Sequence, residues 1–327
     1  GLSPHPWQQT VLNDWLAIDD HGKLLNSLCV LPVPRQNGKT GVIEPRETFG
    51  LLYRGERILH TAHEFQTAKI GFDRLRAKFG KKKNDPNAMY PELNALVDRY
   101  TTSANQMVLD LKNGAHIEFR TRGNNGDAGR GGTFDLVVVD EAQSYTDEQD
   151  AALSPLNSAA PTGSPQFIMT GTVPKPTSAH KGEKFAAIRA DMHSEPYAGA
   201  CIHEWSVREV GDVTDVARWY EANPNLGYEL LESALLKDSR TMNKDTFARE
   251  HLGWWPETTA ASAPISTRDW DACRNEHPQR GGIVCYAVKF SPDGSVGTLA
   301  ACHRGDGSPF VYVVDSRSLS HGIGWCV

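Results

Sequence analysis

The chain has 327 residues, of which 39% are apolar and 23% charged, the proportions of an ordinary soluble globular protein. Its formal net charge of −6 excludes a surface that is basic throughout, so any contact with nucleic acid must come from local basic patches. The six cysteines stand apart without a Cys-x-x-Cys pair, which argues against a zinc site or a disulfide scaffold and favours a reducing compartment. No apolar run approaches the length of a membrane span and no signal peptide opens the chain, so we expect a cytosolic protein.

Residues 4–16 form the first predicted helix, because Val11, Leu12 and Trp15 recur at helical spacing. The Pro-Trp-Gln sequence at its start places Gln8 just upstream of the next motif. The amide of a glutamine carries a donor and an acceptor together and can hydrogen-bond an adenine edge. A helix N-terminus with a packed Trp explains the same residues, and this stretch alone favours that second interpretation.

A phosphate-binding loop is predicted within residues 29–40. A short apolar run there breaks at two prolines, crosses a polar turn and reaches Gly38-Lys39-Thr40 before a predicted helix. In such a loop the backbone N–H groups face the phosphates, the lysine reaches the β- and γ-phosphates and the hydroxyl holds Mg²⁺. The usual pattern has a glycine where this chain has Val33. The residues expected to bind the nucleotide are Arg35, Gln36, Asn37, Gly38, Lys39 and Thr40.

The helix after this loop is predicted to run to about Leu52, followed by a strand at residues 57–63 and a helix at 64–79. Two alternating apolar runs around Asn-Gly predict a β-hairpin over residues 107–119. The next segment, residues 120–132, has five glycines and three arginines. Such a composition cannot pack a core and permits unusual backbone angles, so we expect a loop.

Four apolar residues followed by Asp140 and Glu141 predict a buried parallel strand that delivers two carboxylates at its C-terminal end. An ordinary core strand with polar ends would look similar, but the combination with the lysine loop, in this order, is typical of a nucleotide hydrolase. Hydrolysis of ATP needs charge neutralisation and a positioned water. We expect Asp140 to accept hydrogen bonds from metal-bound water and Glu141 to orient the attacking water as the base.

Hydrolysis also needs a cation for the charge that develops on the γ-phosphate. Arg35, inside the phosphate loop, and Arg130, in the glycine-rich segment, are the two candidates. Either arginine could instead pack the loop or lie on the surface. We favour Arg130 as a finger acting on a neighbouring subunit, because an arginine flanked by glycines can reach outward.

A further buried strand over residues 166–174 ends in Thr170-Gly171-Thr172. Strands that alternate with helices indicate a three-layer α/β domain with a mainly parallel sheet. The remaining predicted segments are a strand at 200–207, helices over 212–252, a linker at 257–264, and strands at 282–290 and 309–314.

Together these motifs resemble the large terminase subunit of tailed bacteriophages, over nearly the whole chain. The motifs that carry the resemblance are Pro-Trp-Gln, Val-Pro-Arg-Gln-Asn-Gly-Lys-Thr, Gly-Arg-Gly, Val-Val-Val-Asp-Glu-Ala-Gln and Thr-Gly-Thr. Trp254-Trp255-Pro and the linker are similar to the family's junction between ATPase and nuclease. An arginine-containing phosphate loop that lacks its first glycine is a specific mark of that family, so Val33 supports the resemblance.

The resemblance implies a RecA-like P-loop ATPase of the additional-strand, catalytic-glutamate type over residues 1–210. A helical subdomain and linker would occupy residues 211–264. The N-terminal part of an RNase H-like nuclease domain, incomplete in this chain, would occupy residues 265–327.

The implied activity is ATP-driven threading of double-stranded viral DNA into a preformed capsid, with ATP and Mg²⁺ as cofactors. The implied partners are DNA, the portal protein and the small terminase subunit, with a homo-oligomeric ring (a pentamer on the portal) working in the host cytoplasm and no membrane contact. By position the resemblance assigns adenine recognition to Gln8, and phosphate and metal binding to Lys39 and Thr40. It makes Asp140 the metal-side acid and Glu141 the catalytic acid. It assigns the arginine finger in trans to Arg130, and the coupling of hydrolysis to movement to Thr170, Gly171 and Thr172.

The nuclease part departs from the family pattern. The family has a run like Val-Asp-Phe-Ser-Pro-Asp-Gly, whose first aspartate binds metal, and this chain has Lys289 at that position, followed by Asp293. An ammonium repels Mg²⁺, and Asp293 and Asp315 alone do not make a two-metal site. The chain also ends at Val327, before the later acidic residues of the family. We therefore expect no DNA cleavage and no nuclease metal, Mg²⁺ or Mn²⁺, in this chain.

Two other interpretations stay open. A superfamily 2 helicase also has Asp-Glu-Ala-Gln and an upstream glutamine, but it needs a second RecA-like domain, which the sequence after Ser206 does not resemble. A non-catalytic DNA-binding or scaffold protein with a relic phosphate loop belongs to a different class, against which the intact Lys39 and Glu141 argue. Turnover of ATP that depends on DNA length would distinguish a translocase from a relic.

Overall fold

The computed structural model describes residues 3–103, 106–122, 131–175, 182–256, 282–290, 296–304 and 309–319, with residues 273, 275, 322 and 324–326. Arg130 and Asp293, two of the residues singled out above, lie outside the described residues. The chain divides into two compact units, Gly1–Ser262 and Ala263–Val327. Within the part of the chain that is described, no helix is long and apolar enough to cross a membrane.

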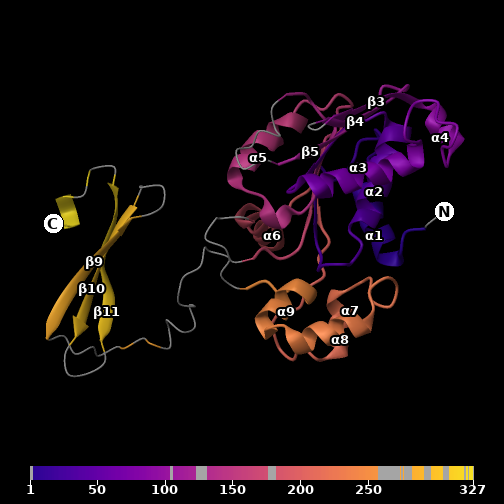
Figure 1. Cartoon of the computed structure of the whole chain (residues 1–327). Helices are drawn as coiled ribbons and strands as arrows, with labels where there is room; N and C mark the ends of the chain where they lie inside the picture. Colours follow the sequence, from indigo (N-terminus) through magenta and orange to yellow (C-terminus); the bar gives the residue numbers. More distant parts are fainter. Residues whose placement is uncertain are drawn as a thin grey trace. The chain divides into compact units, whose positions relative to one another are not determined.

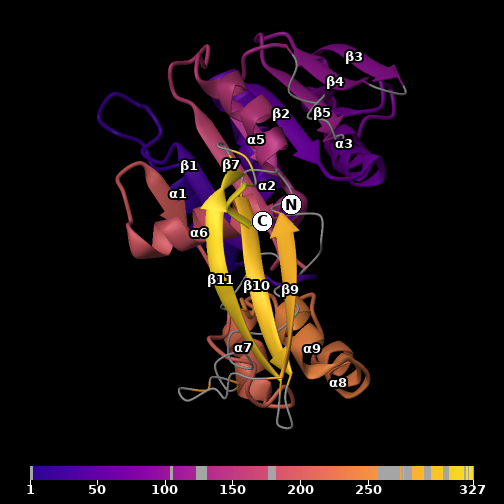
Figure 2. The ribbon, with the colours of Figure 1, turned by 90° about the vertical axis from the view of Figure 1, so that its left-hand side faces the viewer.

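A sheet with strand order β3-β4-β5-β2-β6-β7-β1-β8 forms the centre of the first unit. Its strands are β1 (Leu28–Pro32), β2 (Arg57–Ala62), β3 (Val97–Ser103), β4 (Gln106–Leu111), β5 (His116–Thr121), β6 (Leu136–Val139), β7 (Gln166–Gly171) and β8 (Ala200–Ile202). Neighbours from β5 to β8 run parallel, and β3–β4 and β4–β5 run antiparallel. Figure 2 shows this order across the sheet, from β1 past β7 and β2 to the edge formed by β3 and β4.

Helices cover both faces of the sheet (Figure 1). One face carries α1 (Pro6–Trp15), α2 (Thr40–Phe49) and α3 (Phe65–Phe79), and the other carries α5 (Asp147–Leu153) and α6 (Glu183–Ser194). Leu136 and Val138 of β6 belong to the first core, and Val137 and Val139 to the second. Because both faces of β6 are buried, its sequence is apolar throughout, as parallel sheets require. The predicted three-layer α/β domain with a mainly parallel sheet is confirmed.

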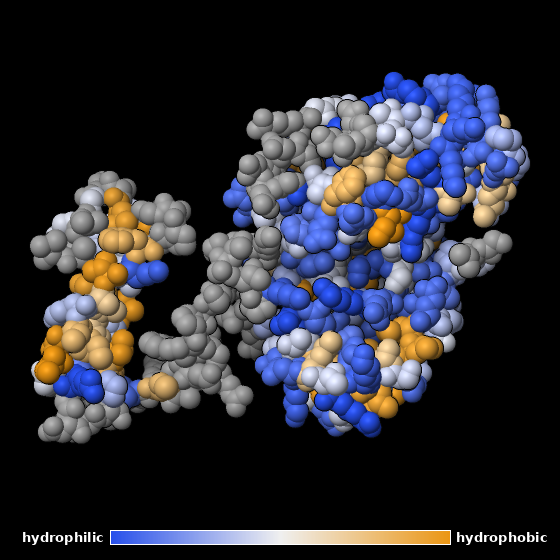
Figure 3. All heavy atoms as spheres, viewed as in Figure 1, coloured by the Kyte–Doolittle hydropathy of each residue, from blue (hydrophilic) through white to orange (hydrophobic). Residues whose placement is uncertain are grey.

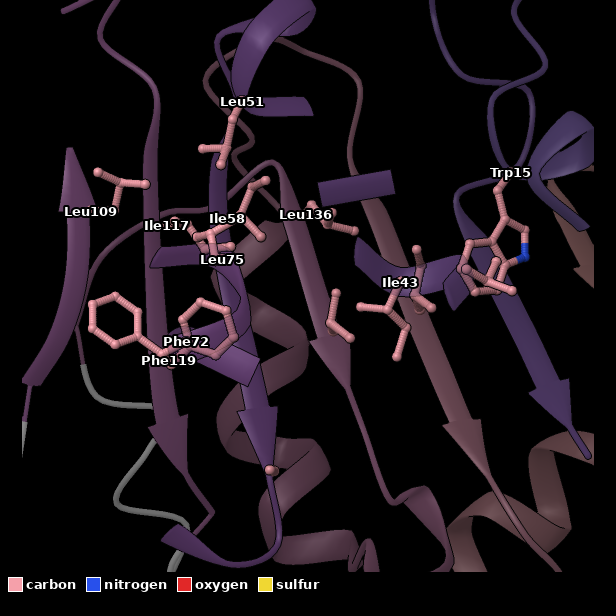
Figure 4. Packing of buried hydrophobic residues seen from close by; sticks show 14 of the residues in the cluster. Trp15, Ile43, Leu51, Ile58, Phe72, Leu75, Leu109, Ile117, Phe119 and Leu136 are labelled. Atoms are coloured by element: carbon pink, nitrogen blue, oxygen red, sulfur yellow. The ribbon is translucent and has the colours of Figure 1, made fainter. Parts of the chain in front are cut away.

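The first core is formed where α2 and α3 pack on the sheet. Buried residues of α3, such as Phe72 and Leu75, recur on one helix face, which is why this segment folds as an amphipathic helix. Figure 4 shows these side chains together with Ile43 of α2 and with Ile58 and Leu136 of the sheet. This packing fixes α2, and with it the loop that precedes α2, against the strands.

Several elements differ from their predicted bounds. The predicted hairpin is present as β4 and β5, and Gly114 in its turn has a φ of 88°, which a glycine adopts without strain. The sequence did not predict β3 or the short helix α4 (Pro91–Ala95). A π-helical turn, Gly50–Arg54, follows α2 in place of its expected last residues.

A small helical subdomain within the first unit consists of α7 (Val216–Ala222), α8 (Glu232–Thr241) and α9 (Lys244–His251), grouped below the sheet in Figure 1. It has a core of its own around Trp219 and Phe247. The strand predicted to reach residue 207 ends at Ile202, although His203 N and Trp205 N still donate to Val30 O (3.0 Å) and Pro32 O (3.2 Å) of β1. At Val207 the chain reaches this subdomain, where Val207 N donates to Leu252 O (2.9 Å).

The second unit contains β9 (Ile283–Phe290), β10 (Val296–Arg304) and β11 (Phe310–Ser318), an antiparallel sheet of order β11-β10-β9. The predicted strands at 282–290 and 309–314 are therefore present. Figure 3 shows apolar residues along these strands, and the exposed ones include Ile283, Val288, Phe290, Val311 and Val313. The RNase H-like assignment of this unit and the division of the first unit near residue 210 stay predictions.

Candidate functional site

The phosphate loop, residues 33–40 between β1 and α2, is wound around the amine of Lys39. Gln36 and Gly38 have φ angles of 62° and 75°, a left-handed conformation that is unusual for a glutamine. Lys39 Nζ donates to the carbonyl oxygens of Val33 (3.3 Å) and Pro34 (3.4 Å). The ammonium thus points into the loop, where a phosphate anion would compete with these carbonyl groups.

The environment of Lys39 lowers the pKa of its side-chain amine. The pKa of Lys39 is lowered from 10.5 to about 8, mainly by burial and also by the nearby Arg35, against the carboxylates of Asp140 and Glu141, which raise it. A bound anion would favour the charged form of such a lysine. Since the charges of Asp140 and Glu141 act on Lys39, the two acids lie close to the loop.

Asn37 fastens the phosphate loop to the helical subdomain. Its side chain is fully buried, and its Nδ2 donates to Asn223 Oδ1 (2.7 Å) and to the loop carbonyls of Pro34 and Arg35 (both 3.2 Å). Its Oδ1 accepts from the backbone N–H of Asn225 (3.1 Å). Asn37 therefore shapes the loop from behind, which explains why an amide stands there.

Arg35 is also bound to the helical subdomain. Its Nε lies 2.8 Å from Glu250 Oε2 at the end of α9, and its backbone N–H donates to Glu250 O (3.3 Å). Glu250 Oε1 also lies 3.6 Å from Lys175 Nζ. The Arg35 side chain is half exposed, so Glu250 holds it at the rim of the loop.

Gln8 packs against the phosphate loop from the N-terminal helix. Its Nε2 donates to Gly38 O (3.1 Å), and its Oε1 accepts from His5 N (2.9 Å). A Cβ atom added at Gly41 would lie 2.4 Å from Gln8 Nε2, so a side chain at position 41 would displace the amide of Gln8. In this arrangement Gln8 supports the loop, and its role in reading adenine stays a prediction.

Asp140, which follows β6, is hydrogen-bonded to the neighbouring strand β7. Its Oδ1 accepts from Thr170 Oγ1 (2.8 Å) and from Glu141 N (2.9 Å). The next residue along β7, Gly171, accepts from Val33 N through its carbonyl (3.1 Å). Thr172 N donates to Gln143 Oε1 (3.2 Å). Thr170 to Thr172 therefore touch both the acid-bearing turn and the phosphate loop.

Glu141 has a left-handed backbone, with φ 55° and ψ 48°. Burial raises the pKa of Glu141, and the negative charges of Asp140 and Glu64 raise it further, whereas Arg122 and Lys39 lower it. A carboxylate with a raised pKa is a better proton acceptor near neutral pH. This environment suits the role of base that the sequence predicted for Glu141, and that role stays a prediction.

The side chains of Thr40 and Asp140 suit a magnesium ion chemically. A hydroxyl and a carboxylate are hard oxygen ligands, which Mg²⁺ prefers together with water and phosphate oxygens. Asp140 uses one carboxylate oxygen for the hydrogen bonds just described, so the other remains for metal-bound water. Among the described residues, no group of three or more His, Cys, Asp or Glu side chains could hold a metal alone.

The sequence missed the residues that hold the site together. Arg122, which follows β5, donates to the carbonyl oxygens of Asp140 (2.7 Å) and Glu141 (3.2 Å). An arginine directly after a strand of a parallel sheet was the available signal, since strand ends meet at one edge. Asn223 and Glu250 gave no such signal, because they lie in helical segments far along the chain.

Comparison with solved structures gives three relevant matches. The HK97 bacteriophage large terminase matches with a TM-score of 0.62 and 19% identity over 95% of this chain, and this chain spans 63% of that protein. The large terminase of a thermophilic bacteriophage matches with a TM-score of 0.50 and 11% identity over 97% of this chain and 68% of its own. A complex of that thermophilic phage protein with ATP-gamma-S matches with a TM-score of 0.51 and 12% identity over 95% of this chain and 68% of its own. This chain has the fold of a large terminase.

The terminase fold confirms the architecture that the motifs suggested. No family model matches the chain, and no curated protein matches it by sequence. At these identities the likeness shows the fold, and the roles of individual residues rest on the contacts described above.

The second unit of this terminase-like chain shows where Lys289 stands. It lies exposed on β9, opposite Thr298 of β10. Asp315 on β11 pairs with Arg317 (2.7 Å between Nη2 and Oδ2), so its carboxylate already has a cationic partner.

Proposed function

We propose that the chain is the ATPase of a DNA-packaging motor, which couples hydrolysis of ATP to translocation of double-stranded DNA. The observation that carries the proposal is a pair of hydrogen bonds, one between Asp140 and Thr170 and one between Val33 and Gly171. It joins the acid-bearing turn and the phosphate loop into one site beside Lys39. The fold shared with the large terminases of HK97 and of the thermophilic phage supports the proposal, as does the complex of the latter with ATP-gamma-S.

In this proposal Lys39 exchanges its bonds with the carbonyls of Val33 and Pro34 for oxygens of the β- and γ-phosphates. The ammonium then neutralises part of the charge that develops during transfer. Mg²⁺, held by Thr40 and Asp140, would supply further neutralisation of the phosphates when bound. Glu141 accepts a hydrogen bond from a water molecule and orients it for attack on the γ-phosphorus, and the products are ADP and inorganic phosphate.

The cation that completes the site is proposed to be Arg130 of a neighbouring subunit. Arg35 is the alternative, but its guanidinium is paired with Glu250, which would have to release it. This arrangement favours a ring, for which a pentamer on the portal protein is the proposed form. The small terminase subunit is the proposed further partner, and the host cytoplasm the proposed location.

Two features support coupling of hydrolysis to movement. Gly171 touches the phosphate loop through Val33, and Asn37 ties the same loop to α7 through Asn223. A change in the loop on hydrolysis would therefore reach both β7 and the helical subdomain. The second unit is proposed to be an RNase H-like domain that does not cut DNA, because Lys289 replaces a metal ligand.

The test of this function is the release of phosphate from ATP with linear double-stranded DNA of increasing length. A translocase should hydrolyse more ATP per binding event as the DNA becomes longer. Turnover that ignores DNA length, or that is stimulated by single-stranded DNA alone, would contradict the proposal and favour a helicase-like ATPase. If the protein shows no ATP turnover that requires Glu141, the result would favour a relic phosphate loop.

A further inference from the structure

Arg122 stands behind the acid-bearing turn, at the end of β5. It reaches across the end of β2, which separates β5 from β6 in the sheet. Nη1 donates to Thr61 O (2.8 Å) and Thr61 Oγ1 (3.0 Å), and Nη2 donates to Asp140 O (2.7 Å) and Glu141 O (3.2 Å). One guanidinium therefore connects three adjacent strand ends.

The surroundings of Arg122 are unusual for a cation. Its side chain is only 2% exposed, and its hydrogen-bond acceptors among the described residues are carbonyl and hydroxyl oxygens rather than carboxylates. Its guanidinium also lies 5.7 Å from the ring centroid of Tyr145. A buried charge without a bonded carboxylate is costly for folding, so such a residue is not explained by stability alone.

The contact that Arg122 makes coincides with backbone strain. Glu141 is one of three residues other than glycine with positive φ among the described residues. The left-handed conformation is unfavourable for a glutamate and persists only where its surroundings impose it. Arg122 Nη2 donates to the carbonyls on both sides of the Glu141 nitrogen and α-carbon, which are the groups whose direction defines this conformation.

Thr61 extends the same network. Its Oγ1 donates to Val138 O (2.9 Å) while it accepts from Arg122, and its carbonyl oxygen accepts from Asp140 N (2.9 Å). The end of β6 is thereby hydrogen-bonded both to Thr61 of β2 and to the guanidinium of Arg122. An arginine suits this position better than a lysine, because its planar fork can bond two strand ends at once.

We propose that Arg122 is a positioning residue for hydrolysis, which fixes the left-handed turn at Glu141 so that its carboxylate faces the water that attacks ATP. The proposal rests on the function proposed above, in which Glu141 orients that water. Arg122 does not touch the nucleotide in this account and acts through Glu141.

The test compares Arg122→Gln and Arg122→Lys with wild type, and uses Arg120→Gln as the matched control. Arg120 lies in β5, two residues before Arg122, but its guanidinium pairs with Glu118. Since a misplaced catalytic group costs up to about 10²-fold in rate, we expect kcat of Arg122→Gln to fall on the order of 10²-fold and that of Arg122→Lys on the order of tenfold. The KM for ATP should change less than about threefold, because the phosphate loop is unaltered. Arg120→Gln should keep both constants.

A double-mutant cycle separates positioning from a general structural effect. If Arg122 acts through Glu141, then Arg122→Gln should cause no further loss of rate in a Glu141→Gln background. Equal losses in both backgrounds, or an unchanged kcat in a folded Arg122→Gln protein, would overturn the inference. If Arg122→Gln does not fold by circular dichroism, the same cycle with Arg122→Lys decides. If wild-type protein and the Glu141→Gln variant hydrolyse ATP at the same rate, that result would contradict the proposed function itself.

Discussion

The side-chain amide of Asn37 donates a 2.7 Å hydrogen bond to Asn223 Oδ1, and this bond joins the phosphate loop to the C-terminal end of α7. Both side chains are buried. Asn223 Nδ2 in turn donates to Trp219 O (2.9 Å) and His251 O (2.7 Å), so the same residue also closes α7 against α9. The shape of the loop and the packing of the helical subdomain are therefore linked.

Asn223→Ala should weaken both stability and nucleotide binding. Removing this amide leaves buried groups unpaired, which costs about 1–3 kcal/mol of unfolding free energy. The loop also loses a support, so the Kd for ATP should rise. Asn243→Ala is the control, because Asn243 caps α9 through Asp245 N (2.9 Å), away from the loop. Urea denaturation and titration with a fluorescent ATP analogue would measure the two effects, and equal loss of affinity in both variants would contradict the link.

Glu141→Gln should retain ATP binding and lose turnover. Loss of a general base reduces rates by about 10²–10⁴-fold, whereas the loop that holds the phosphates is unchanged. Lys39→Ala is the contrasting variant and should weaken binding as well. Single-turnover kinetics and equilibrium binding would measure both. Normal hydrolysis by Glu141→Gln would show that another group orients the water.

The affinity for ATP should fall as the pH rises through 8. The pKa of Lys39 is about 8, so the neutral amine predominates above this pH and cannot neutralise a phosphate. Binding near pH 8 should therefore take up protons, and affinity should decline by up to about tenfold per pH unit above it. Calorimetry in buffers of different ionisation enthalpy would detect the uptake. Lys39→Arg keeps its charge, so its affinity should be independent of pH from 7 to 9.

The same pKa has a consequence for folding. The lysine binds its proton more weakly in the folded chain than in the unfolded chain, where its pKa is near 10.5. Unfolding between pH 8 and 10.5 thus takes up protons at this residue, and its contribution to stability rises with pH across that window. Lys39→Met should remove that contribution.

Mixing two inactive proteins should restore hydrolysis if Arg130 acts in trans. Arginine fingers contribute about 10³–10⁵-fold in rate, so isolated monomer should hydrolyse ATP slowly and the rate should rise with protein concentration. In a mixture of Arg130→Ala and Glu141→Gln proteins, some interfaces pair an intact finger with an intact base. Partial recovery of turnover would support this. No recovery, together with a defect of Arg35→Ala that does not depend on concentration, would assign the role to Arg35.

The chain should not cut plasmid DNA with Mg²⁺ or Mn²⁺. Two-metal cleavage needs carboxylates that hold cations about 4 Å apart, and the resemblance predicts that Lys289 stands where one ligand belongs. Lys289→Asp alone should not restore cutting in this chain, because one more carboxylate beside Asp293 and Asp315 does not supply the several ligands that two cations need. Gel analysis of supercoiled plasmid would measure nicking. Nicking that is abolished by Asp293→Ala would show that the acids present suffice.

The class of the fold, and the hypothesis for the chemistry of the site, could be predicted from the sequence alone. Lys39 follows an apolar strand and a polar turn, and Asp140 and Glu141 follow another apolar strand, so both groups had to meet at the carboxyl edge of a parallel sheet. Those are local patterns, in which neighbouring residues carry the signal. The edge strand β3, whose sequence is mostly polar, and the early end of the other edge strand, β8, escaped prediction, because an edge strand depends on the single neighbour that pairs with it.

The contacts that hold these residues in place became visible in the folded structure and could not be predicted from the sequence. Asn37 and Asn223 are 186 residues apart, and nothing in either local sequence predicts that two buried amides face each other. Arg122 reads as part of a glycine-rich loop, yet its side chain crosses β2 to reach Glu141. Hydrogen bonds of this kind depend on the direction of single side chains after the strands and helices have packed, and a linear pattern does not encode that direction.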